Sequence, residues 1–206
     1  MNIRSILWCI ILSFFATALL SEENIITENN PDENFRAAVK FIEKKNYAEA
    51  INIFSELAEA QIPEAQYNLS LMTYNGLGVP KNFKDALVWS WKAYLNGHNA
   101  AKGQAEKVIT TITPELQDAV ANQIIEELLV EANAGVKNST LKLGQTYMSL
   151  LVQPNFGAAY VWLSIAQAYG IEDASPLLNE VGDQLPIEEV LVQQDEAMKI
   201  FMQINQ

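Results

Sequence analysis

The sequence predicts an all-α protein, a right-handed α-solenoid of about five antiparallel helical hairpins, from three observations. Two segments match each other at an offset of 73 residues, from Phe83 on Phe156 to Gly97 on Gly170. Apolar residues recur at helical spacing through most of the chain after residue 34, and turn residues divide the helical segments into pairs. Repeated helical units bury their apolar faces against their neighbours, so they stack into an extended array.

The N-terminus has the layout of a signal peptide. Arg4 is followed by an apolar run from Ile6 to Leu20, and an acidic segment begins at Glu22. Roughly fifteen apolar residues are short for a membrane span, which needs about twenty. We therefore expect a signal peptide over 1–21 and a periplasmic or secreted protein, with an uncleaved N-terminal anchor as the alternative. Residues 22–34 are polar and lack periodicity, which favours a flexible leader.

Composition excludes several classes of function. Cys9 is the one cysteine and lies in the apolar run, so the domain has no disulfides and no thiol nucleophile. The net charge of −12 repels nucleic acid and anionic lipid headgroups. We expect no nucleic-acid partner, and no contact with a membrane beyond the possible N-terminal anchor.

The repeat domain is predicted over 35–206, and each of its helices has a start or stop signal. Pro63 begins the third helix, and Gly76 ends it because glycine adopts the left-handed conformation that a helix end needs. Asn82 and Asn155 are expected to cap the helices that follow them, and Thr113 is expected to cap another. The predicted helices cover 35–44, 47–60, 63–75, the segment after 82, 100–112, 114–134, 138–149, 156–169, 173–184 and 186–204.

The clearest repeats, 63–98 and 137–171, resemble the Sel-one-like repeats, a branch of the tetratricopeptide-type solenoids. The first repeat carries the pattern at these positions: Ala65, Leu69, Gly76-Leu77-Gly78-Val79, Ala86, Trp89, Ala93 and Gly97-His98. The second repeat has SLLVQPN in place of NGLGVPKN, so its loop lacks glycine. The resemblance implies an adaptor in protein complexes, and for an exported bacterial member a place in the cell envelope or at host contacts.

Two tryptophans of the first repeat are expected to differ in role. Trp89 lies on the same helix face as Ala86 and Ala93, which favours packing between hairpins, and the same holds for Trp162. Trp91 is about 200° away from Trp89 around the helix, so both cannot face one core. Trp91 either packs on an adjacent hairpin or is an exposed recognition anchor, and we include it among the candidate partner-binding residues.

The other candidate partner-binding residues lie on the first helix of each repeat, which lines the concave face in solenoids of this kind. Tyr67, Leu71 and Tyr74 form a stripe separate from the repeat's own packing positions. Tyrosine is an effective interface residue because it is large, stiff and able to hydrogen-bond. We expect a protein or peptide to bind along this concave groove, through that stripe and through its counterparts Leu141, Gln145 and Met148.

We expect no catalytic residues, no cofactor and no metal. His98 has no second histidine to complete a metal site. Adjacent acidic residues on a helix point in different directions, and no phosphate-binding or hydrolase motif is present. The sequence thus favours a non-enzymatic interaction scaffold. The alternative is a cell-wall glycan-binding protein or an envelope hydrolase that uses acidic residues such as Glu127 and Glu189.

Overall fold

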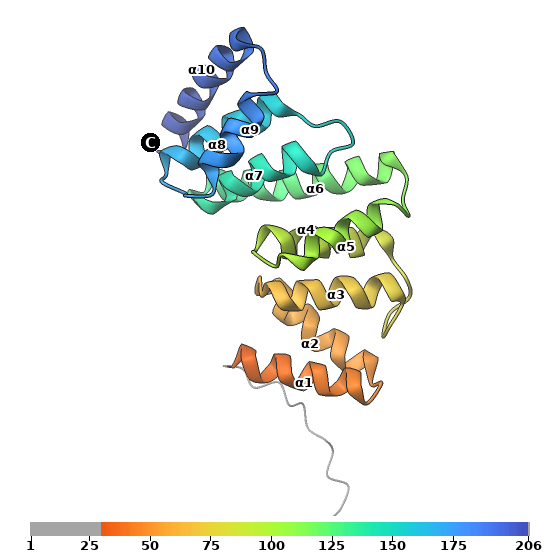
Figure 1. The fold of residues 1–206 in the computed structure, drawn as a ribbon. Coiled ribbons are helices and arrows are strands. Elements are labelled where there is room, and N and C mark those ends of the chain that lie inside the picture. Colours follow the sequence, from red (N-terminus) through yellow and green to blue (C-terminus); the bar gives the residue numbers. More distant parts are fainter. Residues whose placement is uncertain (1–29, 206) are drawn as a thin grey trace, which may run out of the picture.

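A computed structural model describes residues 30–205, and this part of the chain is all-helical. Its ten α-helices follow one another in a single array, with α1 at one end and α10 at the other (Figure 1). The all-α solenoid is therefore confirmed. The predicted signal peptide, 1–21, lies outside the described residues, as does most of the predicted leader, 22–34.

The helix bounds follow the predicted segments closely. The helices are α1 (Pro31–Glu43), α2 (Tyr47–Glu59), α3 (Pro63–Asn75), α4 (Phe83–Leu95), α5 (Ala100–Ile109), α6 (Pro114–Asn133), α7 (Asn138–Ser149), α8 (Phe156–Ala168), α9 (Ala174–Gly182) and α10 (Ile187–Ile204).

The first helix begins at Pro31, earlier than the predicted start at Phe35. The side-chain oxygen of Asn30 accepts a hydrogen bond from the backbone N–H of Glu33 at 3.3 Å. Proline at the first helical position and acidic residues in the first turn also favour a helix start here. Residues 31–34 therefore belong to the helical domain, not to a leader.

The other predicted caps form. The side chain of Asn82 accepts from the backbone N–H of Asp85 at 3.2 Å, and that of Asn155 accepts from Ala158 at 2.9 Å. Thr113 caps α6 in the same way. Gly76 has φ of 75°, the left-handed conformation that ends α3.

The pairing of the helices differs in detail from five equal hairpins. The pairs α1–α2, α3–α4 and α7–α8 pack as hairpins. In contrast, α5 packs mainly on α4, α6 packs mainly on α7, and α9 and α10 both pack mainly on α8. Helix α6 is 20 residues long and also contacts α4, so it joins the two halves of the array. The packing of α3–α5 is thus repeated in α7–α9, whereas α6 and α10, the fourth helices of the two sequence repeats, pack differently.

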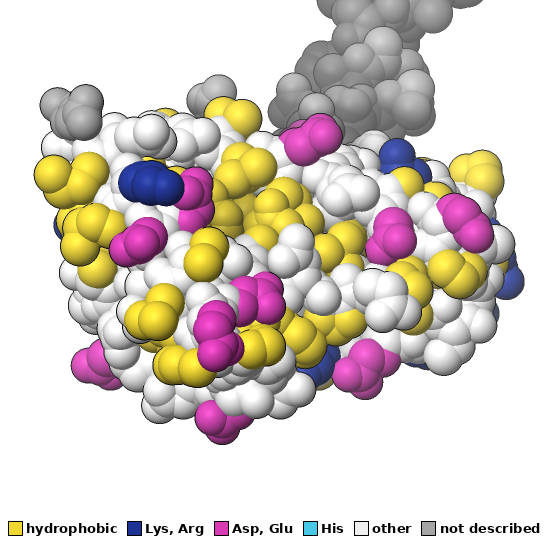
Figure 2. Space-filling model, turned by 90° about the horizontal axis from the view of Figure 1, so that it is seen from above, with side chains coloured by type: hydrophobic (Ala, Val, Ile, Leu, Met, Phe, Trp, Pro, Cys, Tyr) yellow, Lys and Arg dark blue, Asp and Glu magenta, His cyan; other side chains and the backbone are white. Residues whose placement is uncertain are grey.

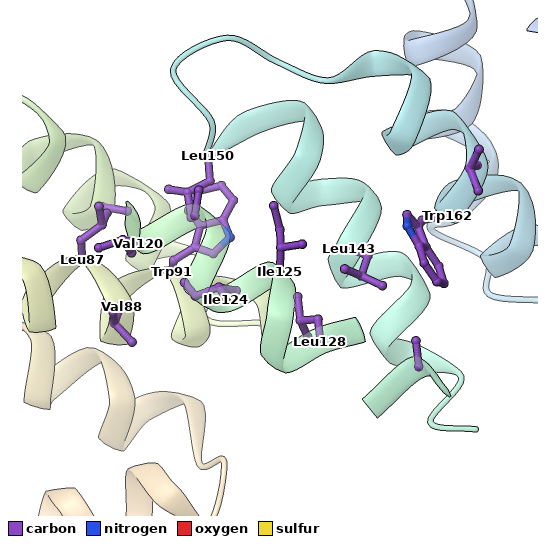
Figure 3. Packing of buried hydrophobic residues seen from close by; sticks show 14 of the residues in the cluster. Leu87, Val88, Trp91, Val120, Ile124, Ile125, Leu128, Leu143, Leu150 and Trp162 are labelled. Atoms are coloured by element: carbon purple, nitrogen blue, oxygen red, sulfur yellow. The ribbon is translucent and has the colours of Figure 1, made fainter. Parts of the chain in front are cut away.

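The largest hydrophobic core lies where α4, α6, α7 and α8 meet (Figure 3). Figure 3 shows Leu143 of α7 between the α6 side chains Ile125 and Leu128 on one side and Trp162 of α8 on the other. A second cluster joins α1, α2 and α3, and a third joins α8 and α9. The chain therefore buries its apolar surface between successive helices rather than around one central core.

Small residues set how closely helices approach. A Cβ atom added at Gly144 would lie 2.5 Å from Cγ of Leu163, so α7 and α8 are in contact at this glycine. Ser70 is in the corresponding place on α3, and its hydroxyl donates to the carbonyl oxygen of Ala86 at 2.8 Å. The same close approach of paired helices is thus achieved with two different residues.

Within residues 30–205, no helix is both long enough and apolar enough to cross a bilayer.

Candidate functional site

The α3 stripe predicted to bind a partner is half-buried, and it contacts side chains of α4, of α5 and of the segment between them. The ring of Tyr67 stacks on the ring of His98 with 4.2 Å between centroids. The ring of Tyr74 lies 5.3 Å from that of Phe83, and Nζ of Lys107 lies 4.6 Å from the centre of the Tyr74 ring. Leu71 is half-buried as well. Part of each side chain is thus engaged in packing within the array.

The counterparts in the second repeat have a similar environment. Leu141, Gln145 and Met148 are half-buried, and Leu141 and Met148 pack against the third hydrophobic cluster. The two stripes belong to α3 and α7, so they do not form one continuous patch on adjacent helices. Their role in partner binding stays a prediction.

Trp91 is not a surface anchor, which corrects one of the two expectations for it. Its side chain is only 2 % exposed, and its indole N–H donates to the hydroxyl oxygen of Thr146 at 3.1 Å. Figure 3 shows it beside Leu150 in the main core. It faces inward because α6 and α7 cover this side of α4.

Trp89 is the tryptophan that keeps an open side. It is half-buried, and Nζ of Lys92 lies 5.5 Å from the centre of its ring. Its counterpart Trp162 is buried in the main core, with Ile200 of α10 packed against the same cluster. The position that corresponds to Ile200 in α6 is Glu127, whose carboxylate forms an ion pair with Lys92 at 2.6 Å. A charged pair in place of an aliphatic side chain leaves the region around Trp89 polar.

Trp89 lines a cavity of about 210 Å³ where five helices meet. Helices α4 and α6 supply most of its walls, and the end of α2, the start of α3 and the start of α7 complete it. The lining residues are Ala58, Glu59, Gln61, Gln66, Trp89, Lys92, Leu95, Asn96, Ile124, Glu127, Leu128, Glu131 and Lys142.

A chain of hydrogen bonds crosses this cavity wall. The amide of Gln66 donates to the carbonyl oxygen of Ala58 at 3.0 Å, and the amide of Asn96 donates to the side-chain oxygen of Gln66 at 2.9 Å. Nζ of Lys142 donates to the side-chain oxygen of Asn96 at 2.6 Å. The network links α2, α3, α4 and α7, so the polar side chains of the cavity are held in fixed positions.

Lys142 is a partly buried lysine of the cavity wall whose pKa is shifted. Burial lowers the pKa of its amine below the ordinary value, and the nearby negative charge of Glu131 opposes this only in part. An ammonium group has three donors. Within the described residues Nζ has one hydrogen-bond acceptor, Asn96. The carboxylate of Glu131 is itself held by the hydroxyl of Ser139, 2.5 Å away. The amine can therefore take a further acceptor from a molecule that enters the cavity.

The acidic residues considered for catalysis do not form one site. Glu127 lines the cavity beside Trp89, whereas Glu189 lies on α10 beside Gly157 of α8. In the described range no group of three histidine, cysteine or acidic side chains could hold a metal ion.

Comparison with known proteins gives a likeness of structure and not of sequence. No protein-family model matches the chain, and no curated protein matches it. A solved structure of a Sel1 repeat protein from Oxalobacter formigenes is 22 % identical with a TM-score of 0.31, and the match covers 83 % of this chain and 88 % of that one. A protective antigen of uropathogenic Escherichia coli strains, which displays an SLR fold, is 18 % identical with a TM-score of 0.32. That match covers 85 % of this chain and 45 % of the antigen, so the chain spans less than half of the antigen's length.

This chain is similar to Sel1-like repeat proteins. The assignment of a solenoid rests on the ten described helices and their packing. The likeness to Sel1-like repeats identifies no ligand.

Sequence reasoning missed the cavity around Trp89. Gln66, Asn96 and Lys142 are 30 and 46 residues apart in the chain, and no motif relates residues at such distances. One sequence signal pointed to it: the repeat places Ile200 where the first unit has Glu127. A charged residue at a position that is apolar in the other copy marks a surface with a different use.

Proposed function

We propose that this protein is an exported, non-enzymatic scaffold of the bacterial cell envelope that binds a segment of another protein. Repeat arrays of this type offer extended surfaces rather than deep catalytic pockets, which supports a binding role. The single observation that carries the proposal is the cavity bounded by Trp89, Lys92 and Lys142, which is lined by both a hydrogen-bonded polar network and a half-open indole ring.

The chemistry of the cavity suits a peptide segment. Its volume of about 210 Å³ is below the usual range for sites that enclose a whole small molecule, and it suits one or two side chains. The indole of Trp89 supplies an apolar surface, and the amine of Lys142 supplies a hydrogen-bond donor in a desolvated place. The partner group we expect is an apolar side chain next to a carboxylate or backbone carbonyl oxygen.

The test begins with a photo-crosslinking amino acid at Gln61, an exposed residue on the cavity rim. Crosslinking in cells and mass spectrometry identify the partner segment, and calorimetry then measures its affinity. We expect Trp89→Ala and Lys142→Met each to weaken binding, with Lys102→Met, at an exposed lysine of α5, as the matched lysine control. Tyr67→Ala with Tyr74→Ala tests the α3 stripe in the same assay. Unchanged affinity for both cavity variants would show that the cavity is not the binding site.

One observation supports the glycan-directed alternative. The cavity holds an aromatic ring together with the carboxylates of Glu59, Glu127 and Glu131, and a ring beside carboxylates also suits a sugar. Soluble wall fragments are therefore the second ligand in the calorimetry. Binding of fragments that is lost in Trp89→Ala, or turnover that is lost in Glu127→Gln, would replace the protein-binding proposal.

The envelope location is also a proposal, and it rests on the N-terminal pattern in the sequence. Fractionation of cells that express the full chain should recover the protein in the periplasm or medium, shorter by about the length of the predicted signal peptide, as mass spectrometry of the N-terminus would show.

A further inference from the structure

Helix α10 carries a stripe of large apolar side chains that nothing in the described chain covers. The exposed fractions are 65 % for Ile187, 56 % for Leu191, 63 % for Met198 and 57 % for Met202. At about 100° per residue, the four lie within an arc of roughly 60° on one face of the helix. The other side of α10 packs on α8 through residues that include Ala197. Figure 2, which views the array from the end where α10 lies, shows hydrophobic and acidic side chains together at this end.

The internal repeat allows this face of α10 to be compared with the corresponding face of α6, which another helix follows. At the 73-residue offset, Leu191 corresponds to Asp118 and Met198 corresponds to Ile125 of α6. The carboxylate of Asp118 accepts from the backbone N–H of Val152, just after α7, and Ile125 is buried in the core beside α7. At the positions of Leu191 and Met198, this face of α6 is thus covered by α7 and the residues just after it. In α10 the same face ends the described array.

The stripe is symmetric along the helix. Ile187 and Met202 are equally far from the point midway between Gln194 and Asp195, and so are Leu191 and Met198. An antiparallel second copy of α10 would therefore place Ile187 on the partner's Met202 and Leu191 on the partner's Met198. A self-complementary patch of this kind is what a two-fold symmetric contact requires.

Charges beside the stripe agree with this arrangement. Glu188 and Lys199 lie on the same flank, and in the antiparallel pair each Glu188 lies near the partner's Lys199. Among the described residues Lys199 pairs only with Glu196, at 3.2 Å and in an exposed position, so it can change partners. Asp195 lies near the middle and would meet the partner's Asp195, which opposes association.

We propose that α10 is the interface of a two-fold symmetric dimer, in which α10 of a second copy packs antiparallel on Ile187, Leu191, Met198 and Met202. A head-to-tail stack lacks a counterpart at the other end, since none of the exposed large hydrophobic residues of the described chain lies in α1. One helix pair is small beside the roughly 800 Å² that each partner buries in a standard interface. The dimer therefore dissociates on dilution.

Sedimentation velocity over a range of concentrations tests the association, with protein expressed from the full chain. The wild type should shift from monomer to dimer as concentration rises, and Leu191→Asp with Met198→Asp should stay monomeric. Val130→Asp is the matched control, because Val130 is 71 % exposed on α6, away from the stripe. A wild type that stays monomeric at high concentration, or a stripe variant that dimerises as the wild type does, would overturn the proposal.

Charge reversal tests the register. Glu188→Lys and Lys199→Glu should each weaken dimerisation roughly tenfold, since each replaces two weak attractions by repulsions, and the double variant should recover most of the affinity. Asp195→Asn should strengthen the dimer by removing the like-charge contact. Failure of the double variant to recover, with both single variants weakened, would show that the copies associate in another register.

Cysteine crosslinking tests the direction of the two helices, in a Cys9→Ser background. Gln194→Cys lies near the symmetry point, so mild oxidation should join two copies through it. Ile187→Cys should not join to its own counterpart, because antiparallel packing separates these positions by roughly 20 Å, at about 1.5 Å per residue. Crosslinking of two copies through Ile187→Cys would indicate parallel helices and contradict the proposal.

Discussion

Trp91 and Trp89 are two residues apart, and the structure gives them opposite environments. Trp91 is enclosed by the core and donates a hydrogen bond to Thr146, 55 residues further along the chain. Trp89 forms part of the cavity wall. The sequence established that the two could not share a face, because two residues turn a helix by about 200°. It did not establish which face a neighbouring helix covers, since that depends on where α6 and α7 lie.

Replacement of Trp91 should strongly destabilise the fold. Trp91→Ala removes a buried side chain and leaves a cavity, so we expect a loss of about 3–5 kcal/mol in the free energy of unfolding. Trp91→Phe keeps most of the volume and leaves Thr146 without the indole donor, which should cost about 1–2 kcal/mol. Urea unfolding measures both. Trp89→Ala is the control, with an expected loss of about 1 kcal/mol. Equal losses for the two alanine variants would contradict the assignment of core and surface.

Lys142 should give the stability a dependence on alkaline pH. Burial lowers its pKa in the folded chain, so the unfolded chain binds more protons between that lowered value and the ordinary value of about 10.4. Stability from this group therefore rises as the pH rises through that window. The Lys142→Met variant should lack this rise of stability with pH, whatever its free energy of unfolding at neutral pH.

Urea unfolding of the wild type and Lys142→Met between about pH 7 and pH 10 checks this point. The comparison must be made between the two proteins, because burial also raises the pKa of Tyr147, and that contribution is lost above the ordinary tyrosine value of about 10. Parallel stability curves for the two proteins would show that the amine of Lys142 is not desolvated in the folded chain.

At the scale of elements, apolar spacing and capping residues were enough to locate the helices. Asn82, Asn155, Thr113 and Gly76 mark ends that the structure confirms. These signals are local, so the sequence shows them directly. The packing of α5 on α4 and of α6 on α7, in place of a hairpin between α5 and α6, depends on contacts between elements. No local signal reports such contacts, which is why the sequence predicted five similar hairpins.

The contact between α7 and α8 should be sensitive to one methyl group. Gly144→Ala places a Cβ atom against the branched carbon of Leu163, so we expect a loss of about 1–3 kcal/mol. Gly103 is the matched control: it is helical and exposed on α5, and an added Cβ there meets nothing within 4 Å. Gly103→Ala should stabilise by about 0.5–1 kcal/mol. Denaturant unfolding measures the stability of both variants. If Gly144→Ala left the free energy of unfolding unchanged, α8 would be able to move away from α7 without cost.

At the scale of the whole molecule, stability should fall from the middle of the array to its ends. Helix α1 buries only Asn34 and Ala38, and α10 buries only Ala197, whereas α8 buries eight residues. Neighbouring units of a linear array hold one another, and an end unit has one neighbour instead of two. Native-state hydrogen exchange should therefore give the lowest opening free energies in α1 and α10 and the highest in α4 to α8. One common value for all helices would indicate a single cooperative unit.

Because Trp89 and Trp91 lie in different environments, the fluorescence of each can report a different event. An indole in a dry core emits at shorter wavelength than one that contacts water, so the emission of Trp91 should respond to loss of the packing between α4 and α7. The emission of Trp89 should respond to any molecule that fills the cavity and displaces its water. Single-tryptophan variants would thus separate occupancy of the cavity from unfolding in the same sample. The second repeat cannot report occupancy in this way, because Trp162 is already enclosed in the core.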